Sequence, residues 1–426
     1  MGGLTANQHA ADPVALPPRR FALTYLTMTA TDSFGSGLFK TLAVLFWSRY
    51  AHLSLPTVGI GLTLGGLVAM AALLPLGRLG DRVGHRRMVI ALNLVVGAVV
   101  ACFPLVRQPA LFFAVVAVAS AAEAALGPLR RSYVGRQLSP PVRRRFNARN
   151  RATFNAGFGC GAALAGVGLA TGSNRVLVLL VLGNAASFGI AAVAMYLLPP
   201  DRAPDQPAAG TAEVRSVLGH PRLIGSGALI GLLALSEEAL EIGVPVWIAT
   251  THRVPVTMIS VALVVNTVFV VLFQVPLARR LESLPTLRSF RLAGCLLLLA
   301  FALMAPAWLL PRPAAIAVLV VFVLLLSTSE VIAATVDWDV SYRTARAGRE
   351  SESQAAFSLG TNSHRAVGGV LFAGALAAGP AGWLVACAAP ALVLAASSYR
   401  GVRRLAGIDG IAGEPAAGPA AGGAAS

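Results

Sequence analysis

The stretch Gly77-Arg-Leu-Gly-Asp-Arg-Val-Gly-His-Arg-Arg87 decides how this chain folds. It is a short, arginine-rich and glycine-punctuated link between two long apolar runs, Val58 to Leu76 and Met88 to Val106. Each run predicts a membrane-spanning helix, because roughly 20 helical residues cross a hydrocarbon core of about 30 Å. The stretch is therefore expected to turn tightly between two spans on the aqueous side that collects basic residues.

The composition of the whole chain indicates an all-α membrane protein. Of the 426 residues, 56% are hydrophobic and 12% are charged, and the mean hydropathy is +0.72. A soluble domain carries about 25% charged residues. The net charge of +16 could suggest nucleic acid binding, but the arginines lie in short segments between apolar runs, which indicates membrane topology and no nucleic acid partner. The four cysteines lie far apart inside apolar runs, so no disulfide framework or metal site is expected.

Twelve apolar segments are predicted to be transmembrane helices, because the runs are too long for barrel strands and only helices or closed barrels satisfy the backbone in lipid. The predicted spans are 21–48, 57–77, 88–106, 109–129, 146–171, 175–198, 222–250, 256–278, 289–310, 313–338, 354–378 and 380–400. A polar linker at 199–221 divides them into two six-helix halves, 21–198 and 222–400.

The distribution of basic residues predicts the orientation. Most of them lie in the N-terminal tail 1–20, in the loops that follow even-numbered spans, and in the C-terminal tail 401–426, which is expected to be largely disordered. This bias predicts that both termini are cytoplasmic. The loop before predicted span five is the richest in arginine, and it is interpreted as an anchor at anionic lipid headgroups. Its arginines are Arg130, Arg131, Arg136, Arg143, Arg144, Arg145, Arg149 and Arg151.

An internal repeat supports the division into halves. The segment Pro75–Asp81 aligns with 276–282 at a constant offset of 201, and Arg87 then falls on Arg288. The second copy lacks the glycines, so only the first keeps the complete pattern. Duplicated halves of this kind are common in transporters.

The opening stretch also resembles the loop signature of the major facilitator superfamily, Gly-x-Leu-x-Asp-Arg-x-Gly-x-Arg-Arg. The resemblance implies a transporter in which two halves alternate around a midplane site, with this loop as a conformational switch. It implies that Asp81 meets the positive end of span eleven and that nearby arginines pair with acids across the interface. The alternative is a generic basic loop. The matched residues are Gly77, Leu79, Asp81, Arg82, Gly84, Arg86 and Arg87.

Ionisable side chains inside predicted spans are the candidate functional residues, because each costs at least about 2.5–3.5 kcal/mol to insert. Asp32 and Glu123 are the candidates for proton coupling. The alternative is that such groups pair to hold helices together, which is favoured for Asp337, Asp339 and Arg365, while Asn266 and Gln274 can bond between helices. The candidates for the cavity or substrate site are Glu238, Glu241, Glu330, Asn266, Gln274 and Arg365.

Further resemblances point to efflux. Span four of many drug antiporters carries Arg-x-x-x-Gly, and aligning Gly127 with that glycine puts Glu123 in place of the arginine, which would suit a cationic substrate or direct protonation. Gly157-x-x-x-Gly161-Ala-x-x-Ala-Gly166 keeps three glycines of the antiporter motif in span five, although close helix packing also explains them. The stretch 238–247 resembles actinobacterial members of the superfamily.

The sequence therefore predicts a secondary active transporter of the inner cell membrane, working as a monomer by proton-coupled export of a small organic compound such as a drug or secondary metabolite. Its expected partners are that compound, protons and the lipid bilayer, and no cofactor or metal is expected. One alternative is proton-coupled uptake of a sugar, amino acid or metabolite, and another is a membrane sensor that does not transport. No phosphate-binding loop or intramembrane catalytic triad is present in the sequence, so neither ATP-driven pumping nor an enzyme is predicted.

Overall fold

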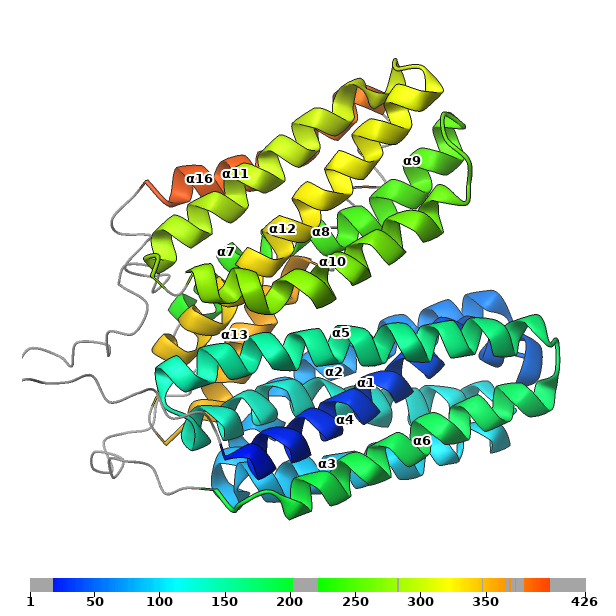
Figure 1. Cartoon of the computed structure of the whole chain (residues 1–426). Helices are drawn as coiled ribbons and strands as arrows, with labels where there is room; N and C mark the ends of the chain where they lie inside the picture. Colours follow the sequence, from blue (N-terminus) through cyan, green and yellow to red (C-terminus); the bar gives the residue numbers. More distant parts are fainter. Residues whose placement is uncertain are drawn as a thin grey trace, which may run out of the picture.

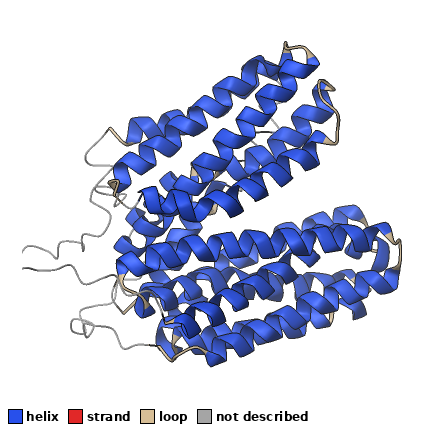
Figure 2. Cartoon of the chain, in the orientation of Figure 1, coloured by secondary structure: helices blue, strands red, loops and turns tan. Residues whose placement is uncertain are grey.

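The computed structural model describes residues 18–201, 221–281, 283–346, 348–364, 368, 372 and 379–398. All regular secondary structure in these ranges is helical, as the sequence predicts (Figure 2). Most of both predicted tails, most of the linker 199–221, and the candidate Arg365 lie outside the described residues.

The N-terminal half is a bundle of long helices that follow the predicted spans closely. Helices α4 and α5 continue through the basic segment that was expected to be a loop, and only two residues separate them. Arginine is a good helix former, so charge does not end a helix where it leaves the membrane. The elements are α1 (Arg19–Leu45), η1 (Phe46–Tyr50), α2 (Leu55–Val83), α3 (His85–Ala101), η2 (Phe103–Leu105), α4 (Pro109–Gln137), α5 (Pro140–Ala170) and α6 (Asn174–Leu197).

The C-terminal half is more broken. Predicted span seven, 222–250, is divided by a turn and by the π-helical segment η4, which carries Glu241. The elements are α7 (Pro221–Gly231), α8 (Leu235–Glu238), η4 (Ala239–Gly243), α9 (Val244–Thr251), α10 (Met258–Leu281), α11 (Thr286–Met304), η5 (Ala305–Trp308), α12 (Arg312–Thr344), α13 (Glu350–Thr361), α15 (Gly379–Ala386) and α16 (Ala388–Ala396).

Ten helices among the described residues are long and apolar enough to cross a membrane. Helix α1 is not one of them, because it carries Asp32, Lys40 and several threonines and serines, and predicted span eleven lies partly outside the described residues. The structure therefore supports a multi-pass membrane protein. The number twelve and the cytoplasmic position of both termini remain predictions.

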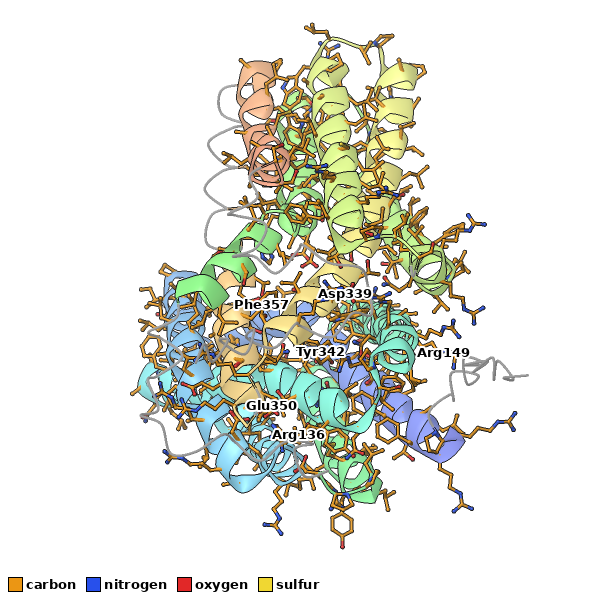
Figure 3. The ribbon with its side chains drawn as sticks, turned by 90° about the vertical axis from the view of Figure 1, so that its left-hand side faces the viewer. Arg136, Arg149, Asp339, Tyr342, Glu350 and Phe357 are labelled. Carbon is orange, nitrogen blue, oxygen red and sulfur yellow. The ribbon has the colours of Figure 1, made fainter. Side chains whose placement is uncertain are left out.

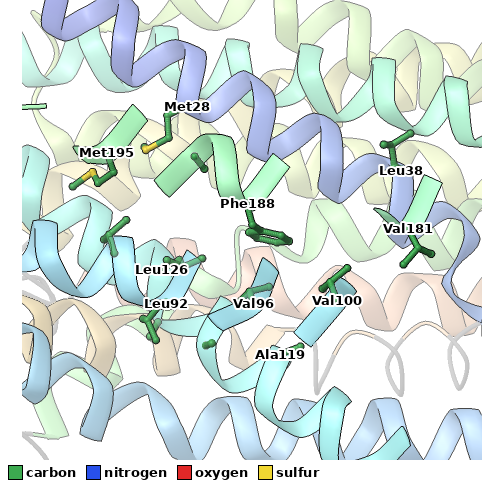
Figure 4. Close-up of a cluster of buried hydrophobic side chains, with 14 of the residues drawn as sticks. Met28, Leu38, Leu92, Val96, Val100, Ala119, Leu126, Val181, Phe188 and Met195 are labelled. Atoms are coloured by element: carbon green, nitrogen blue, oxygen red, sulfur yellow. The ribbon is translucent and has the colours of Figure 1, made fainter. Parts of the chain in front are cut away.

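The two halves form two helical bundles with separate apolar cores (Figure 1). Buried side chains of α1, α3, α4 and α6, such as Met28, Val96 and Phe188, fill the N-terminal core (Figure 4). A small third cluster joins the bundles, in which Leu73 and Leu74 of α2 pack with Ala355 and Ala356 of α13.

The bundles meet at the end where α1 begins and diverge towards the opposite end (Figure 1). Helix α13 makes the junction, because it packs against α2 and α4 of the N-terminal half as well as against α7 of its own half. We call these two ends of the molecule the joined end and the diverging end.

Small residues bring helices into close contact within the N-terminal half. A Cβ atom at Gly157 or Gly161 of α5 would collide with backbone oxygens of α1, at Ala30 and Phe34 respectively. These two glycines therefore have a packing role, which is one of the two explanations that the sequence leaves open.

Candidate functional site

At the joined end, Asp81 caps helix α13 of the opposite half. Its Oδ1 accepts a hydrogen bond from the backbone N–H of Ser351 at 2.8 Å, and its Oδ2 accepts one from Glu352 at 2.9 Å. The carboxylate thereby satisfies two free N–H groups and faces the positive end of the helix dipole. This is the contact that the family resemblance implies for Asp81.

The glycines of the same loop permit this contact. A Cβ atom at Gly77 would lie 2.9 Å from the backbone oxygen of Ser351, so a side chain there would push the two halves apart. Gly84 has a φ of 102°, in the region that favours glycine, and it separates α2 from α3. The spacing of the motif thus places Asp81 against α13 and turns the chain directly afterwards.

The arginines of the loop divide between the two halves. Arg78 crosses to Glu352 at 2.7 Å. Arg86 stays in its own half, where it donates to the backbone oxygens of Met195 and Tyr196. Arg78 confirms the expectation that arginines near Asp81 pair with acids across the interface, whereas Arg86 does not cross it. The exposed Arg82 and Arg87 form no side-chain hydrogen bond or ion pair with any described residue.

His85, at the variable place of the motif, is completely buried between two acids. Its Nε2 lies 3.3 Å from Oδ1 of Asp81, and its Nδ1 lies 3.4 Å from Oδ1 of Asp201. Burial by itself raises the pKa of Asp201, but the hydrogen bond and charge of His85 outweigh it and hold that pKa below its usual value. His85 thus connects Asp81 to Asp201 within the N-terminal half.

One group of side chains here has the spacing of a metal site. The ligand atoms of Asp81, His85 and Glu350 lie within 4.8 Å of one another. The oxygens of Asp81 are already engaged by the α13 backbone, however, and Glu350 binds Arg136 and the backbone N–H of Gly348. These side chains are therefore better explained as hydrogen-bonded contacts between the halves than as ligands of a metal ion.

Three further ion pairs join the halves around this cap. Arg131 pairs with Asp337 at 2.9 Å, Arg136 with Glu350 at 2.6 Å, and Arg144 with Asp339 at 2.8 Å. Figure 3 shows Arg136 and Glu350 in the zone where the bundles meet, with Asp339 and Tyr342 nearby.

These pairs correct the interpretation of the arginine-rich segment before span five. Its arginines were expected to contact lipid headgroups, but at least three of them bind acids of α12 and α13. The expectation that Asp337 and Asp339 are structural ion-pair partners is confirmed, and the same expectation for Arg365 falls outside the described residues. Together with the Asp81 cap and the Arg78–Glu352 pair, these contacts form what we call the latch.

A polar cavity of about 200 Å³ lies between the halves next to the latch, and Arg131 and Asp337 of the latch line it. Arg151 of α5 reaches across it to Glu330 at 2.7 Å and to Glu237 at 3.2 Å. Asn266 donates to Glu330 at 3.0 Å, so two of the predicted site residues meet here. His364 also lines this cavity, with its Nε2 3.9 Å from Glu238.

The remaining C-terminal candidates lie apart from this network or at its edge. Glu238 is 8% exposed beside His364, whereas Glu241 is exposed on η4. Gln274 is fully buried, and neither of its amide atoms has a hydrogen-bond partner among the described residues. The structure therefore brings Glu330, Asn266 and Glu238 towards one cavity, and it does not bring Gln274 there.

The two proton-coupling candidates have different surroundings. Asp32 is buried in α1 and pairs with Arg130 of α4 at 2.6 Å, while Arg130 also donates to Asn93. Glu123 lines a second cavity, of about 310 Å³, on the N-terminal half. Sequence reasoning missed Arg130, which follows Glu123 by seven residues, two helical turns, and so lies on the same face of α4.

The chain belongs to the Major Facilitator Superfamily, whose family model matches residues 25–373. It is therefore a membrane transporter and not an enzyme. No curated protein sequence matches the chain.

Several solved structures share the fold at low identity. The human organic anion transporter MFSD10 (TETRAN) has a TM-score of 0.63 at 16% identity, over 89% of this chain and 99% of its own. A bacterial homologue of the iron transporter ferroportin in an outward-facing state has a TM-score of 0.67 at 15% identity, over 88% and 97%. The transporter FucP in the outward conformation has a TM-score of 0.64 at 12% identity, over 90% and 99%.

Proposed function

We propose that the protein exports a small organic compound in exchange for protons, by alternating access of a site between its halves. The observation that carries the proposal is the difference between the two ends. The joined end is held mainly by ion pairs and a helix cap, whereas the other end diverges. The side chains of these pairs are largely buried, and the cost of removing their charges from water offsets much of their attraction, so such a junction can open and close reversibly.

The excess of basic residues at the joined end supports a cytoplasmic position for it. The structure then corresponds to an outward-facing state with the cytoplasmic side latched. The likeness to two proteins described as outward-facing or in the outward conformation supports this assignment. We propose on the same ground that both termini are cytoplasmic, and that the protein lies in the inner cell membrane.

Asp32 and Glu123 are the proposed proton carriers. Protonation of Asp32 would remove the charge that holds Arg130, and release of that arginine would loosen α4 against α1. Glu123 reaches a cavity, so it can exchange a proton for a cationic group of the transported compound. Export by antiport follows from this exchange, because one acid cannot hold the proton and the cation together.

The network around Arg151 is the proposed contribution of the C-terminal half. Glu237 and Glu330 share Arg151 across the interface, so this contact must change when the halves rock. Glu238 and Asn266 lie beside it and are proposed to line the site when it faces the cytoplasm, and the exposed Glu241 is proposed to join them.

Proton flux in inside-out vesicles with an acid interior tests the proposal. A small organic compound that carries an ammonium group, added outside as the first member of a compound panel, is expected to release protons from vesicles that contain the protein and not from empty ones. Movement of protons in the same direction as the compound would instead indicate uptake by symport. Binding without any movement would indicate a sensor.

A further inference from the structure

The cavity beside Glu123 holds two opposite charges that are not paired with each other. It is lined by Lys40 of α1 and Glu123 of α4, and both residues are exposed. Neither forms an ion pair or hydrogen bond with any residue in the described ranges, and Lys40 is the only lysine of the chain. Two charges facing one cavity without a mutual contact leave a place for a ligand between them.

The rest of the lining is apolar and aromatic. Phe39, Trp47 and Phe103 form one wall, with ring centroids 5.3 Å apart for Phe39–Phe103 and 4.8 Å apart for Trp47–Phe103. Trp47 and Phe103 are buried and support the partly exposed ring of Phe39, so the wall offers an apolar surface to an apolar or aromatic group.

Two buried polar atoms of the lining also have no partner. The Nε1 of Trp47 is a donor and the Oδ1 of Asn184 is an acceptor, and neither makes a hydrogen bond within the part of the chain that the structure describes. Trp47 is 0% exposed and Asn184 is 1% exposed. Neither atom is accessible to solvent, so both lie behind the surface of the cavity, and the charges of Lys40 and Glu123 carry the recognition of a ligand.

We propose that this cavity binds small zwitterions with an aromatic or apolar body, with the ligand anion at Lys40 and the ligand cation at Glu123. A zwitterion can contact both charges at once, whereas a ligand with only one charge can contact only one of them. The volume of about 310 Å³ is at the small end of the range of about 300–1,000 Å³ for ligand pockets, so the ligand is small. The inference rests on the proposed function, because it names the class of compound that the transporter carries.

Three probes that share one indole ring test the charge pattern. Tryptophan carries both charges at pH 7, tryptamine carries only the cation, and indole-3-acetate carries only the anion. Equilibrium binding of each radiolabelled probe to the purified protein in nanodiscs is measured without any proton gradient. Tryptophan is expected to bind at least about tenfold more tightly than either singly charged probe, since a hydrogen bond to a charged group contributes about 1.5–3 kcal/mol.

Two variants should change the ranking in opposite ways. Lys40→Met should bring the affinity for tryptophan down to that for tryptamine, and Glu123→Gln should bring it down to that for indole-3-acetate. Lys40→Met should still bind tryptamine and Glu123→Gln should still bind indole-3-acetate, which shows that each variant is folded. The control is Arg107→Gln, which removes a cation that stacks on Tyr50 outside the cavity and should leave all three affinities unchanged.

Equal binding of the three probes, or a ranking that neither variant alters, would overturn the inference. That result leaves the export proposal standing if proton exchange with other compounds is observed. The expected ranking without any proton exchange would have the opposite meaning, since it would support the binding site and contradict antiport.

Discussion

The substitution Asp81→Asn removes the charge that caps α13 while leaving both cavities intact. In the structure this carboxylate accepts hydrogen bonds of 2.8 and 2.9 Å from the backbone of the opposite half, and its side chain is 7% exposed. Asparagine keeps one acceptor oxygen but turns an N–H₂ group towards the second backbone N–H. One charge-assisted bond and the interaction with the helix dipole are therefore lost.

The magnitude follows from those two losses. A hydrogen bond to a charged group contributes about 1.5–3 kcal/mol and the dipole about 0.3–1 kcal/mol, so the latched state should lose about 2–4 kcal/mol. This corresponds to a change of about 30- to 800-fold in the ratio of latched to unlatched molecules. Transport should fall much more than ligand binding, because Asp81 lines neither cavity.

The assay measures distances between spin labels at Arg107 and Arg253, near the diverging end, in a variant whose four cysteines are replaced by serine. Asp81→Asn should shift the distribution towards shorter distances, because the halves close there when the latch opens. Asp201→Asn is the matched control, since Asp201 also contacts His85 but does not reach the other half. An unchanged distribution for Asp81→Asn, an equal shift for both variants, or equal losses of transport and binding would refute the reasoning.

Three further predictions concern other contacts. Asp32→Asn and Glu123→Gln, measured separately, should each reduce the rate of proton-driven transport about tenfold or more, because each removes a group that is proposed to carry a proton. Full transport in both variants would show that the assignment of the proton carriers is wrong. Gly77→Ala should destabilise the latched state by about 1–3 kcal/mol, because its Cβ would meet the backbone of α13. Gly66→Ala is the control, because a Cβ atom there meets no atom within 4 Å. The distances between the spin labels at Arg107 and Arg253 test whether only Gly77→Ala shifts the equilibrium. Arg151→Gln should lower the Tm in detergent, because it leaves Glu237 and Glu330 without the arginine that neutralises them. The expected cost is about 1–3 kcal/mol, reduced because the Arg151 side chain is 28% exposed to solvent. An unchanged Tm would contradict this prediction.

The sequence predicted which segments form helices better than it predicted which side chains pair between them. Long apolar runs determine spans by themselves, because the hydrocarbon core sets their length, and the loop motif predicted the position of Asp81 against α13. The partner of Arg144, by contrast, lies 195 residues away at Asp339, and no local pattern encodes such a pairing. The π-helical η4 was likewise not predicted, since it depends on tertiary packing more than on residue type.

The same limit applies to the acids of α1 and α4. Asp32 and Glu123 were equivalent in the sequence, as two carboxylates within spans. The structure separates them, because Arg130 reaches Asp32 and Glu123 shares a cavity with Lys40. Whether a buried charge has a counter-ion depends on which helix faces it, and that information comes only from the assembled bundle.

The direction of the ion pairs in the latch has a consequence for biosynthesis. In the pairs that join α2 and α4 or α5 to α12 and α13, the cation comes from the N-terminal half and the acid from the C-terminal half. Chains fold from the N-terminus as they are made. A newly inserted first half therefore displays unneutralised guanidinium groups until the ribosome has delivered the acids, and two such halves from neighbouring ribosomes repel each other. The charge pattern thus protects the nascent protein against assembling with the wrong copy.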